Sequence, residues 1–337
     1  MGIYGIHEKL VRKMNQRRFG RTGWMVSEIG YGAWQIGGNM WGDVSDERAR
    51  AALRAAIDSG VDFFDTALAY GNDRSEQLVG RVLRDARVLD DVRIATKVPP
   101  LNREWPARAD ARLRDVFPMR WIRECAERSL RNLRREPIDL LQLHVWADAW
   151  TDDNEWVDAM LELREAEKIR AFGVSLNSHE PDSGVRVVAS GRIDSVQVIY
   201  NVFDDTAATE LFPAAAENDV AVIVRVPLDE GSLAGTLRDD TTFADEDWRA
   251  TYFTPDRLPE TAARVEKLRP VLQTRDQTLA QGALRFCLTP PEVSTVIVGS
   301  TNAAHVADNA AVSELGPLDE ETLDRLKAHR WARNFYA

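Results

Sequence analysis

Cysteine and histidine are scarce in this sequence. Its 337 residues include two cysteines, Cys125 and Cys287, and five histidines. Two thiols so far apart in the sequence provide neither a disulfide framework nor the spacing of a metal site. We therefore predict no metal centre, and we expect both cysteines to be reduced and buried in helices.

The sequence also lacks a long hydrophobic run and a surplus of positive charge. No stretch is long enough to span a bilayer, and the N-terminal MGIYGIHEKLVRKMNQRR lacks the apolar core of a signal peptide. The formal net charge is −11, whereas nucleic-acid-binding proteins usually carry a basic surplus. We expect a cytoplasmic protein without membrane or nucleic-acid partners, and leave its oligomeric state open. Residues 1–17 are interpreted as an N-terminal extension and residues 18–337 as a single domain.

Short apolar runs recur along the chain and are predicted to be strands. Runs that are continuously apolar, rather than alternating with polar residues, are typical of strands buried on both faces of a parallel sheet. The eight runs lie at residues 26–32, 62–66, 92–98, 138–144, 169–175, 193–200, 220–226 and 294–299.

Segments with helical spacing of apolar residues separate these runs. The first, at 46–60, ends at Gly60, a favourable C-terminal cap; the next is predicted to begin with Ser75 as its N-cap, and Pro118 precedes a third. Eight alternations of strand and helix predict a closed (β/α)8 TIM barrel, a single-domain α/β fold. An open doubly wound sheet is disfavoured because GYGAWQIGG, at the end of the first strand, does not match G-x-G-x-x-G.

Two segments interrupt this alternation. Residues 17–26, RRFGRTGWMV, place turn residues between short extended pieces and predict a small hairpin that closes the bottom of the barrel. Residues 227–258 form a long loop after the seventh strand. Loops of such length are usually functional or mobile.

Polar side chains at the C-terminal ends of the predicted strands are the candidates for catalysis, because the active site of a barrel enzyme lies at that face. Asp65 ends the second strand, Tyr70 follows it, Lys97 ends the third strand and His144 ends the fourth. Each residue alone could solvate the rim of the barrel or satisfy a structural contact. Together, on consecutive strands, they suggest an active site.

These four residues suit the reduction of a carbonyl group. The reaction needs a hydride donor and an acid that protonates the developing alkoxide. The unperturbed pKa of tyrosine is about 10, and a neighbouring ammonium such as that of Lys97 lowers it. Asp65 would hold Lys97 charged and oriented, and His144 would donate a hydrogen bond to the substrate oxygen.

The same segments resemble the signature segments of the aldo-keto reductases. The similarity extends from about residue 18 to about residue 312 and is carried by DTALAYGNDRSEQLVG (65–80), ATKV (95–98), LLQLH (140–144), FGVS (172–175), VQVIYN (196–201) and VIVGSTNAAHVADN (296–309). It implies an NAD(P)H-dependent enzyme that reduces an aldehyde or ketone to an alcohol, with Tyr70 as general acid, Lys97 and Asp65 as its tuning pair and His144 as substrate orienter. It implies NADP as the favoured cofactor, with NAD possible, and a C-terminal loop shorter than in some relatives.

The resemblance also implies which residues hold the cofactor. Ser175, Asn177 and Gln197 match the positions that bind the nicotinamide carboxamide, although GVSLN is one residue longer than the usual G-V-S-N. Asn177 could instead cap a helix, and Gln197 could be a buried structural amide. The remaining cofactor positions are Trp34, Arg225, Pro227, Leu228, Gly231, Leu233, Gly299, Ser300, Thr301, His305 and Asn309.

Two further cofactor positions, Arg225 and His305, leave alternatives open. The residues that would contact the substrate are less well defined. Arg225 stands where many relatives have an aromatic residue, so its guanidinium could stack on the nicotinamide or bind the pyrophosphate. His305 could be a solvent-facing helix residue. A small-molecule carbonyl or alcohol is expected to contact Tyr70 and His144 within an aromatic wall formed by Trp34, Trp41 and Trp146. These tryptophans could equally pack the rim of the barrel.

Two other functions are compatible with a barrel of this kind. A lyase or hydrolase would usually need a cluster of metal-binding carboxylates or histidines at the strand ends, and activity that survives strong chelation would argue against it. A cofactor-sensing or channel-associated regulatory protein would keep the cofactor site and turn over slowly. The intact quartet favours an enzyme.

Overall fold

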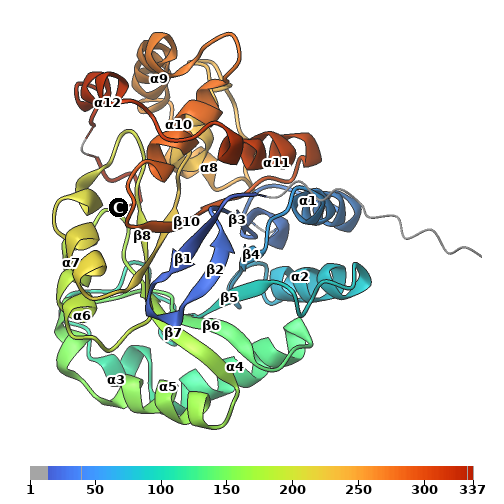
Figure 1. The fold of residues 1–337 in the computed structure, drawn as a ribbon, viewed down its shortest axis with the longest axis vertical. Helices are drawn as coiled ribbons and strands as arrows, with labels where there is room; N and C mark the ends of the chain where they lie inside the picture. The colour runs from blue at the N-terminus through green and yellow to red at the C-terminus, as the bar shows by residue number, and fades with distance from the viewer. Residues whose placement is uncertain (1–13, 39, 332, 337) are drawn as a thin grey trace, which may run out of the picture.

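The computed structural model describes residues 14–38, 40–331 and 333–336. Eight parallel strands form a closed barrel in the order β10-β3-β4-β5-β6-β7-β8-β9 (Figure 1). The barrel strands are β3 (Ile29–Gly32), β4 (Phe63–Asp65), β5 (Arg93–Val98), β6 (Ile138–Leu143), β7 (Ile169–Ser175), β8 (Ser195–Ile199), β9 (Ala221–Arg225) and β10 (Val293–Val298). Every predicted run overlaps one of them, and the predicted (β/α)8 barrel is confirmed.

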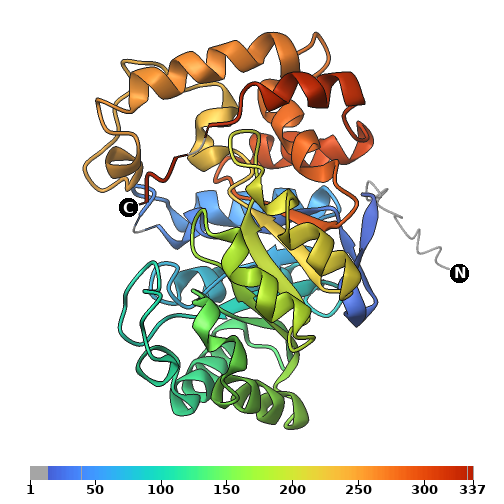
Figure 2. The same ribbon diagram turned by 90° about the vertical axis from the view of Figure 1, so that its left-hand side faces the viewer.

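Helices surround the barrel and cover the outer faces of its strands (Figures 1 and 2). The helices that follow successive strands are α1 (Asp46–Asp58), α2 (Arg74–Asp85), α4 (Met119–Leu133), α5 (Glu155–Glu165), α6 (Val185–Ala189), α7 (Leu211–Glu217), α10 (Leu279–Leu288) and α11 (Ala303–Ala310). Four more are α3 (Leu113–Val116), α8 (Arg249–Tyr252), α9 (Leu258–Leu272) and α12 (Glu320–Lys327). Helix α9 was not predicted, because Pro259 and Pro270 obscure its pattern although Pro259 lies in the first turn, where proline is tolerated.

Two of the three predicted helix boundaries are confirmed. Gly60 follows α1 with φ 85°, and Pro118 directly precedes α4. The Ser75 prediction is wrong: α2 begins at Arg74, and the Ser75 hydroxyl donates to the carbonyl of Ala33 at 2.7 Å. The serine therefore ties α2 to the loop after β3 instead of capping its own helix.

Side chains that alternate along the strands give the barrel interior two different layers. The lower layer is apolar and contains Phe63, Ala95, Leu140, Ala171, Ala221, Ile223 and Ile297. Two residues beyond Phe63 on β4 and Ala95 on β5, towards the C-terminal ends, stand Asp65 and Lys97, and Gln197 on β8 is buried as well. The period of two thus places a polar layer directly above an apolar one.

The hairpin predicted at the N-terminal end is present and closes the apolar layer from below. Strand β1 (Gln16–Phe19) pairs antiparallel with β2 (Trp24–Ser27), and Phe19 lies 5.4 Å, between ring centroids, from Phe63 inside the barrel. The hairpin begins before the boundary predicted at residue 18, and residues 1–13 of the predicted extension lie outside the described residues. The loop predicted after the seventh strand is also confirmed between β9 and α9.

Both cysteines are free and buried, one in α4 and one in α10, as expected. Burial raises the pKa of the Cys125 thiol to about 12, which keeps it protonated at neutral pH. Among the described residues, no helix combines the length and the hydrophobicity required to cross a membrane.

The loop that carries Tyr70 depends on a close approach of two backbones. Gly71 has φ +65°, and a Cβ there would overlap the carbonyl oxygen of Gly37. We predict that Gly71→Ala costs about 1–2 kcal/mol for the left-handed conformation and about 1–3 kcal/mol more for overpacking. Gly42→Ala is the matched control, because Gly42 has φ +70° but open space around its Cβ position. Urea unfolding of both variants measures the difference, and equal losses would contradict the prediction.

Candidate active site

Asp65, Lys97 and Tyr70 form one connected group at the C-terminal end of the barrel. The Lys97 ammonium donates to Asp65 Oδ1 at 2.5 Å, to the Thr66 carbonyl at 2.9 Å and to the Tyr70 hydroxyl at 3.2 Å. Lys97 is completely buried and the Asp65 side chain is 2% exposed. The ammonium therefore joins the carboxylate to the phenol, in the arrangement that the sequence predicted.

Burial changes the acidity of this group in a way that the sequence did not predict. Burial alone would lower the pKa of Lys97, but the charges and hydrogen bonds of Asp65 and Tyr70 together outweigh it, and the pKa of Lys97 is raised. For Tyr70, burial outweighs the opposing charge of Lys97, and the pKa of the phenol is raised. The expectation of a lowered tyrosine pKa is therefore wrong in net sign, although Lys97 acts in the expected direction. Tyr70 stays protonated at neutral pH, which suits a proton donor.

His144 follows β6 and faces Tyr70. The two rings lie 5.5 Å apart between centroids at an interplanar angle of 73°. Burial, followed by the charges of Lys97 and Arg225, holds the pKa of His144 well below 6.5. The imidazole is therefore neutral at pH 7, and one ring nitrogen carries the hydrogen that it can donate. Its Nδ1 has no hydrogen-bond partner among the described residues.

Gln197 is bound to Asp65 of this connected group. Its amide donates to Asp65 Oδ2 at 2.8 Å and accepts from the Ser175 hydroxyl at 3.4 Å. Both oxygens of Asp65 are thus engaged, one by Lys97 and one by Gln197. The amide has a second N–H, so the expected contact with a carboxamide is compatible with this arrangement. The link from β8 across to β4 could not be read from the sequence.

Asn177 is hydrogen-bonded to neighbouring loops. Its side chain exchanges hydrogen bonds of 3.1 Å with both the N–H and the carbonyl of Ala107, and its amide also donates to Glu180 at 2.9 Å. The Asn177 amide is thus bound to the loop between β5 and α3, and it does not cap a helix.

Arg225 ends β9 and brings a positive charge to the site. Its Nη2 donates to the Leu176 carbonyl at 3.0 Å and to the Ser178 hydroxyl at 3.4 Å. Its Nε is buried without a partner among the described residues, and its charge lowers the pKa of both Tyr70 and His144. The Arg225 guanidinium thus has one bound nitrogen, Nη2, and one unpartnered nitrogen, Nε. It could stack on a flat ring or bind an anion.

The loop after β9 continues into a strained turn. Asp229, Glu230 and Gly231 all have positive φ angles, of 47°, 53° and 98°; such strain costs about 1–3 kcal/mol for each non-glycine residue. A Cβ on Gly231 would meet no atom within 4 Å, so open space adjoins the backbone. Phosphate sites in barrels often lie at the loops after strands seven and eight, and this turn follows the seventh strand of the barrel. Leu233 is fully buried and could contribute its backbone alone, while Pro227 and Leu228 precede the turn.

The loop after β10 leads to the start of α11. Gly299 lies against the carbonyl oxygen of Gly32, which leaves no room for a side chain. Ser300 and Asn309 are buried, Thr301 is partly buried and His305 is exposed. Arg48 of α1 donates from Nε to the Thr301 carbonyl at 3.2 Å, which places a cation that sequence analysis missed beside this loop.

Aromatic side chains line the approach to Tyr70. Trp34 lies 6.2 Å from Tyr70, 5.3 Å from Trp41 and 5.3 Å from Trp248, all between ring centroids. Trp105 is 48% exposed and lies 5.9 Å from His144. Trp105 and Trp248 were missed because they belong to long loops. Their only sequence signal was an aromatic residue in a loop at the C-terminal face of the barrel.

Trp146 does not line the mouth, contrary to the expectation. Its side chain is fully buried, its indole N–H donates to the Ser183 carbonyl at 3.1 Å, and its ring packs against Trp150 and Trp156. The backbone turns after His144, so the residue two positions later faces the helices outside the barrel.

Comparison with known proteins agrees with this geometry. A model of the Aldo/keto reductase family matches residues 28–330. The chain belongs to the aldo-keto reductase family. It is 33% identical over 282 residues to the aldo-keto reductase YhdN of Bacillus subtilis, covering 83% of this chain and 82% of that protein. It is 30% identical to a probable voltage-gated potassium channel subunit beta of Oryza sativa, covering 94% and 96%. The holo structure of aldo-keto reductase AKR11C1 from Bacillus halodurans superposes with a TM-score of 0.74 at 26% identity, covering 95% and 97%.

Lys97 and its partner Asp65 should together tune the acidity of Tyr70. Lys97 lowers the pKa of Tyr70, and Asp65 raises the pKa of Lys97 against the effect of burial. If Tyr70 is the proton donor in reduction, activity falls as pH rises through its pKa. We predict that Lys97→Met moves this decline to higher pH, and that Asp65→Asn does so more mildly, because the buried ammonium loses the counter-ion that keeps it charged.

The pH profiles of kcat for these two variants test this prediction. Lys168→Met, which removes a lysine with partly exposed surface ion pairs, is the control and should leave the profile unchanged. Profiles that stay unmoved in both site variants would show that charge does not tune Tyr70.

Proposed function

We propose that this protein is an NAD(P)H-dependent reductase of aldehydes or ketones, with Tyr70 as its general acid. The observation that carries the proposal is the contact of 3.2 Å between the Tyr70 hydroxyl and the buried Lys97 ammonium, which is itself paired with Asp65. A proton donor held by a buried cation, beside a neutral imidazole, is suited to a carbonyl oxygen that becomes negative during the reaction.

The residues of the chain would divide the reaction between them. The bound nicotinamide supplies a hydride to the carbonyl carbon. Tyr70 donates its proton to the carbonyl oxygen, so that one C–H and one O–H bond form and an alcohol results. Lys97 stabilises the tyrosinate that remains, and His144 donates a hydrogen bond to the same oxygen. In the direction of alcohol oxidation, the tyrosinate of Tyr70 accepts the proton.

The cofactor would extend from the centre of the barrel to α11. Ser175 and the free N–H of Gln197 are proposed to bind the carboxamide, with Trp34 and Arg225 beside the nicotinamide. The backbone at Pro227, Leu228, Gly231 and Leu233 would contact the pyrophosphate. The adenosine half would lie against the loop after β10, formed by Gly299, Ser300, Thr301, His305 and Asn309.

The substrate would enter between the aromatic side chains that surround Tyr70. Trp34, Trp41, Trp105 and Trp248 are the proposed wall, and they favour carbonyl compounds with an apolar or ring-bearing portion. Trp146 is not part of this wall, because it is buried.

A regulatory, cofactor-sensing role is the alternative, favoured by the similarity to a probable potassium channel subunit beta. Such a protein would bind the cofactor and turn over slowly. A panel of aldehydes, followed by the loss of nicotinamide absorbance, separates the two functions. Turnover of 1 to 1,000 per second is typical of enzymes, and a protein that binds NADPH but reduces every aldehyde far more slowly would be a sensor.

Tyr70→Phe tests the catalytic assignment directly. The variant keeps the ring but removes the proton donor, and general acid catalysis contributes about 100- to 10,000-fold. We predict a loss of kcat in that range with an unchanged cofactor Kd, measured by quenching of the fluorescence of the ten tryptophans. Tyr200→Phe, which changes a buried tyrosine packed against Phe212 and Phe286 on the outside of the barrel, serves as a control. A Tyr70→Phe variant with wild-type kcat would refute the proposal.

Arg48 is proposed to favour NADPH over NADH. It stands beside Thr301, where its charge can reach a 2′-phosphate, and a charged hydrogen bond contributes about 1.5–3 kcal/mol. We predict that Arg48→Ala weakens NADPH binding about tenfold and leaves NADH binding unchanged, and that the wild-type preference shrinks with salt. Arg54→Ala, exposed on the same helix, is the control. An equal effect of Arg48→Ala on both cofactors would contradict this role.

A further inference from the structure

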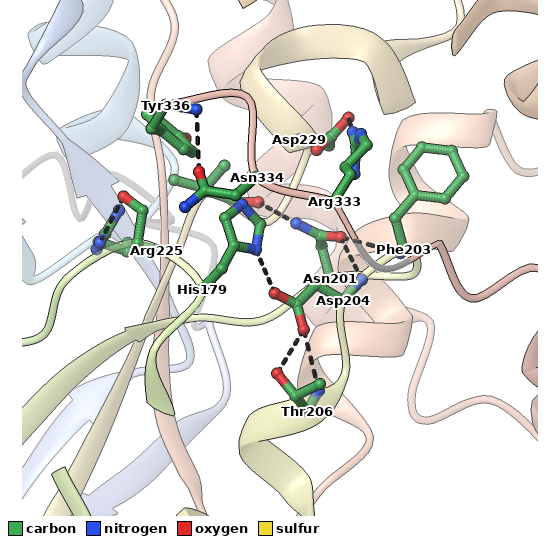
Figure 3. A network of polar contacts seen from close by, with 12 residues as sticks. His179, Asn201, Phe203, Asp204, Thr206, Arg225, Asp229, Arg333, Asn334 and Tyr336 are labelled. Atoms are coloured by element: carbon green, nitrogen blue, oxygen red, sulfur yellow. Dashed lines mark hydrogen bonds and ion pairs between the residues drawn. The ribbon is translucent and has the colours of Figure 1, made fainter. Parts of the chain in front are cut away.

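The C-terminal segment 333–336 packs against the strained turn after β9 (Figure 3). Arg333 Nη2 lies 2.5 Å from Asp229 Oδ2, with the two side chains 5% and 1% exposed. The Tyr336 hydroxyl donates to Glu230 Oε1. The two acidic side chains of the turn are thus turned towards this segment, one paired with a cation and the other covered by a phenol.

Other contacts fix the segment in this position. The ring of Tyr336 stacks on Trp248, 5.7 Å between centroids, and lies 5.7 Å from His179. Arg257 donates to the Phe335 carbonyl at 3.2 Å. Because Trp248 also contacts Trp34, a continuous series of aromatic rings connects the segment to Tyr70.

The position of the two acidic residues poses an electrostatic problem for the proposed function. Asp229 and Glu230 immediately precede Gly231, where open space adjoins the backbone and where we placed the cofactor pyrophosphate. Two free carboxylates there would repel a diphosphate. Asp229 is also bound by the Ser232 hydroxyl at 2.5 Å and the Tyr252 hydroxyl at 3.3 Å, but these neutral groups do not cancel its charge.

We propose that the C-terminal segment is part of the cofactor site, in which Arg333 neutralises Asp229, Tyr336 covers Glu230, and both hold the strained conformation of the turn so that it can bind the pyrophosphate. Both are positioning residues, because they act through Asp229 and Glu230. The inference rests on the proposed function, since it requires that the bound ligand is a nicotinamide dinucleotide.

The charge state of Glu230 supports this role. Burial raises the pKa of Glu230 from 4.5 to about 7. The groups that face it are Tyr336 and Asp229, with the charges of Arg225 and Arg249 nearby. With the segment in place, Glu230 is protonated below about pH 7 and adds no charge to the turn. As pH rises through 7 it ionises, which repels the cofactor, although the hydrogen bond from Tyr336 favours the ionised carboxylate.

Cofactor binding by two arginine variants is the first test. Arg333→Met leaves Asp229 buried and unpaired, and it should raise the Kd for NADPH and the dissociation rate constant about tenfold or more. Arg330→Met is the matched control. Its ion pair with Asp205 has the same length of 2.5 Å, but the side chains are 54% and 18% exposed, so the change should be within about twofold.

A double variant separates charge neutralisation from a purely structural contribution. Asp229→Asn combined with Arg333→Met removes both charges, and it should restore most of the cofactor affinity that Arg333→Met loses. A double variant that binds as weakly as Arg333→Met would overturn the electrostatic role. The single and double variants can be compared even if Arg333→Met is less stable. Circular dichroism measures the folded fraction of each variant, and the Kd is then compared at equal concentrations of folded protein.

The pH dependence provides the third measurement. The Kd for NADPH of the wild type should rise between about pH 6 and pH 8, and this rise should be lost in Glu230→Gln. Failure of the wild type to bind either NADPH or NADH would refute the proposed function, and this inference with it. Tight binding by the wild type, together with unchanged dissociation rates in Arg333→Met and Tyr336→Phe, would refute the inference alone.

Discussion

The buried ammonium of Lys97 is the constraint on which the active site depends. An isolated charge in the interior of a barrel is very unfavourable, so the surrounding structure must supply a counter-ion and acceptors. Asp65, the Thr66 carbonyl and the Tyr70 hydroxyl meet this requirement. Gln197 then satisfies the second oxygen of Asp65. The hydrogen bonds that compensate the buried charge of Lys97 also fix the Tyr70 phenol beside the neutral His144. The positions of these side chains therefore follow from the free-energy cost of burying Lys97.

Such a site cannot stabilise the fold on its own, because a buried ion pair is often less favourable than apolar packing. The barrel places an apolar layer immediately beneath the polar one, with Phe63 below Asp65 on β4 and Ala95 below Lys97 on β5. The N-terminal hairpin seals that layer with Phe19. On β4 and β5, the apolar residues that stabilise the fold therefore lie towards the N-terminal ends, and the polar residues of the candidate site lie towards the C-terminal ends.

Three acidic groups near the site are either paired with a cation or buried with a raised pKa, although the protein as a whole carries a formal charge of −11. Asp65 is paired with Lys97 and Asp229 with Arg333, while burial raises the pKa of Glu230 to about 7. Arg225 adds a partly unpaired positive charge. The net effect is little uncompensated negative charge on these residues of an acidic protein, as the proposed binding of an anionic cofactor requires, and Arg333 of the C-terminal segment supplies one of the compensating charges.

The sequence by itself determined the barrel, the hairpin and the candidate quartet, because these depend on local periodicity and on which residues end each strand. Tertiary structure decided what depends on distant partners. Ser75 bonds to Ala33, Asn177 is bound to Ala107, and Trp146 turns into the core, none of which a strand-end pattern contains. It also decided the sign of the Tyr70 pKa shift, since burial is a property of the folded molecule. The contact of Arg333 with Asp229 joins residues that are 104 positions apart, and only folding brings two such charges into the same buried site.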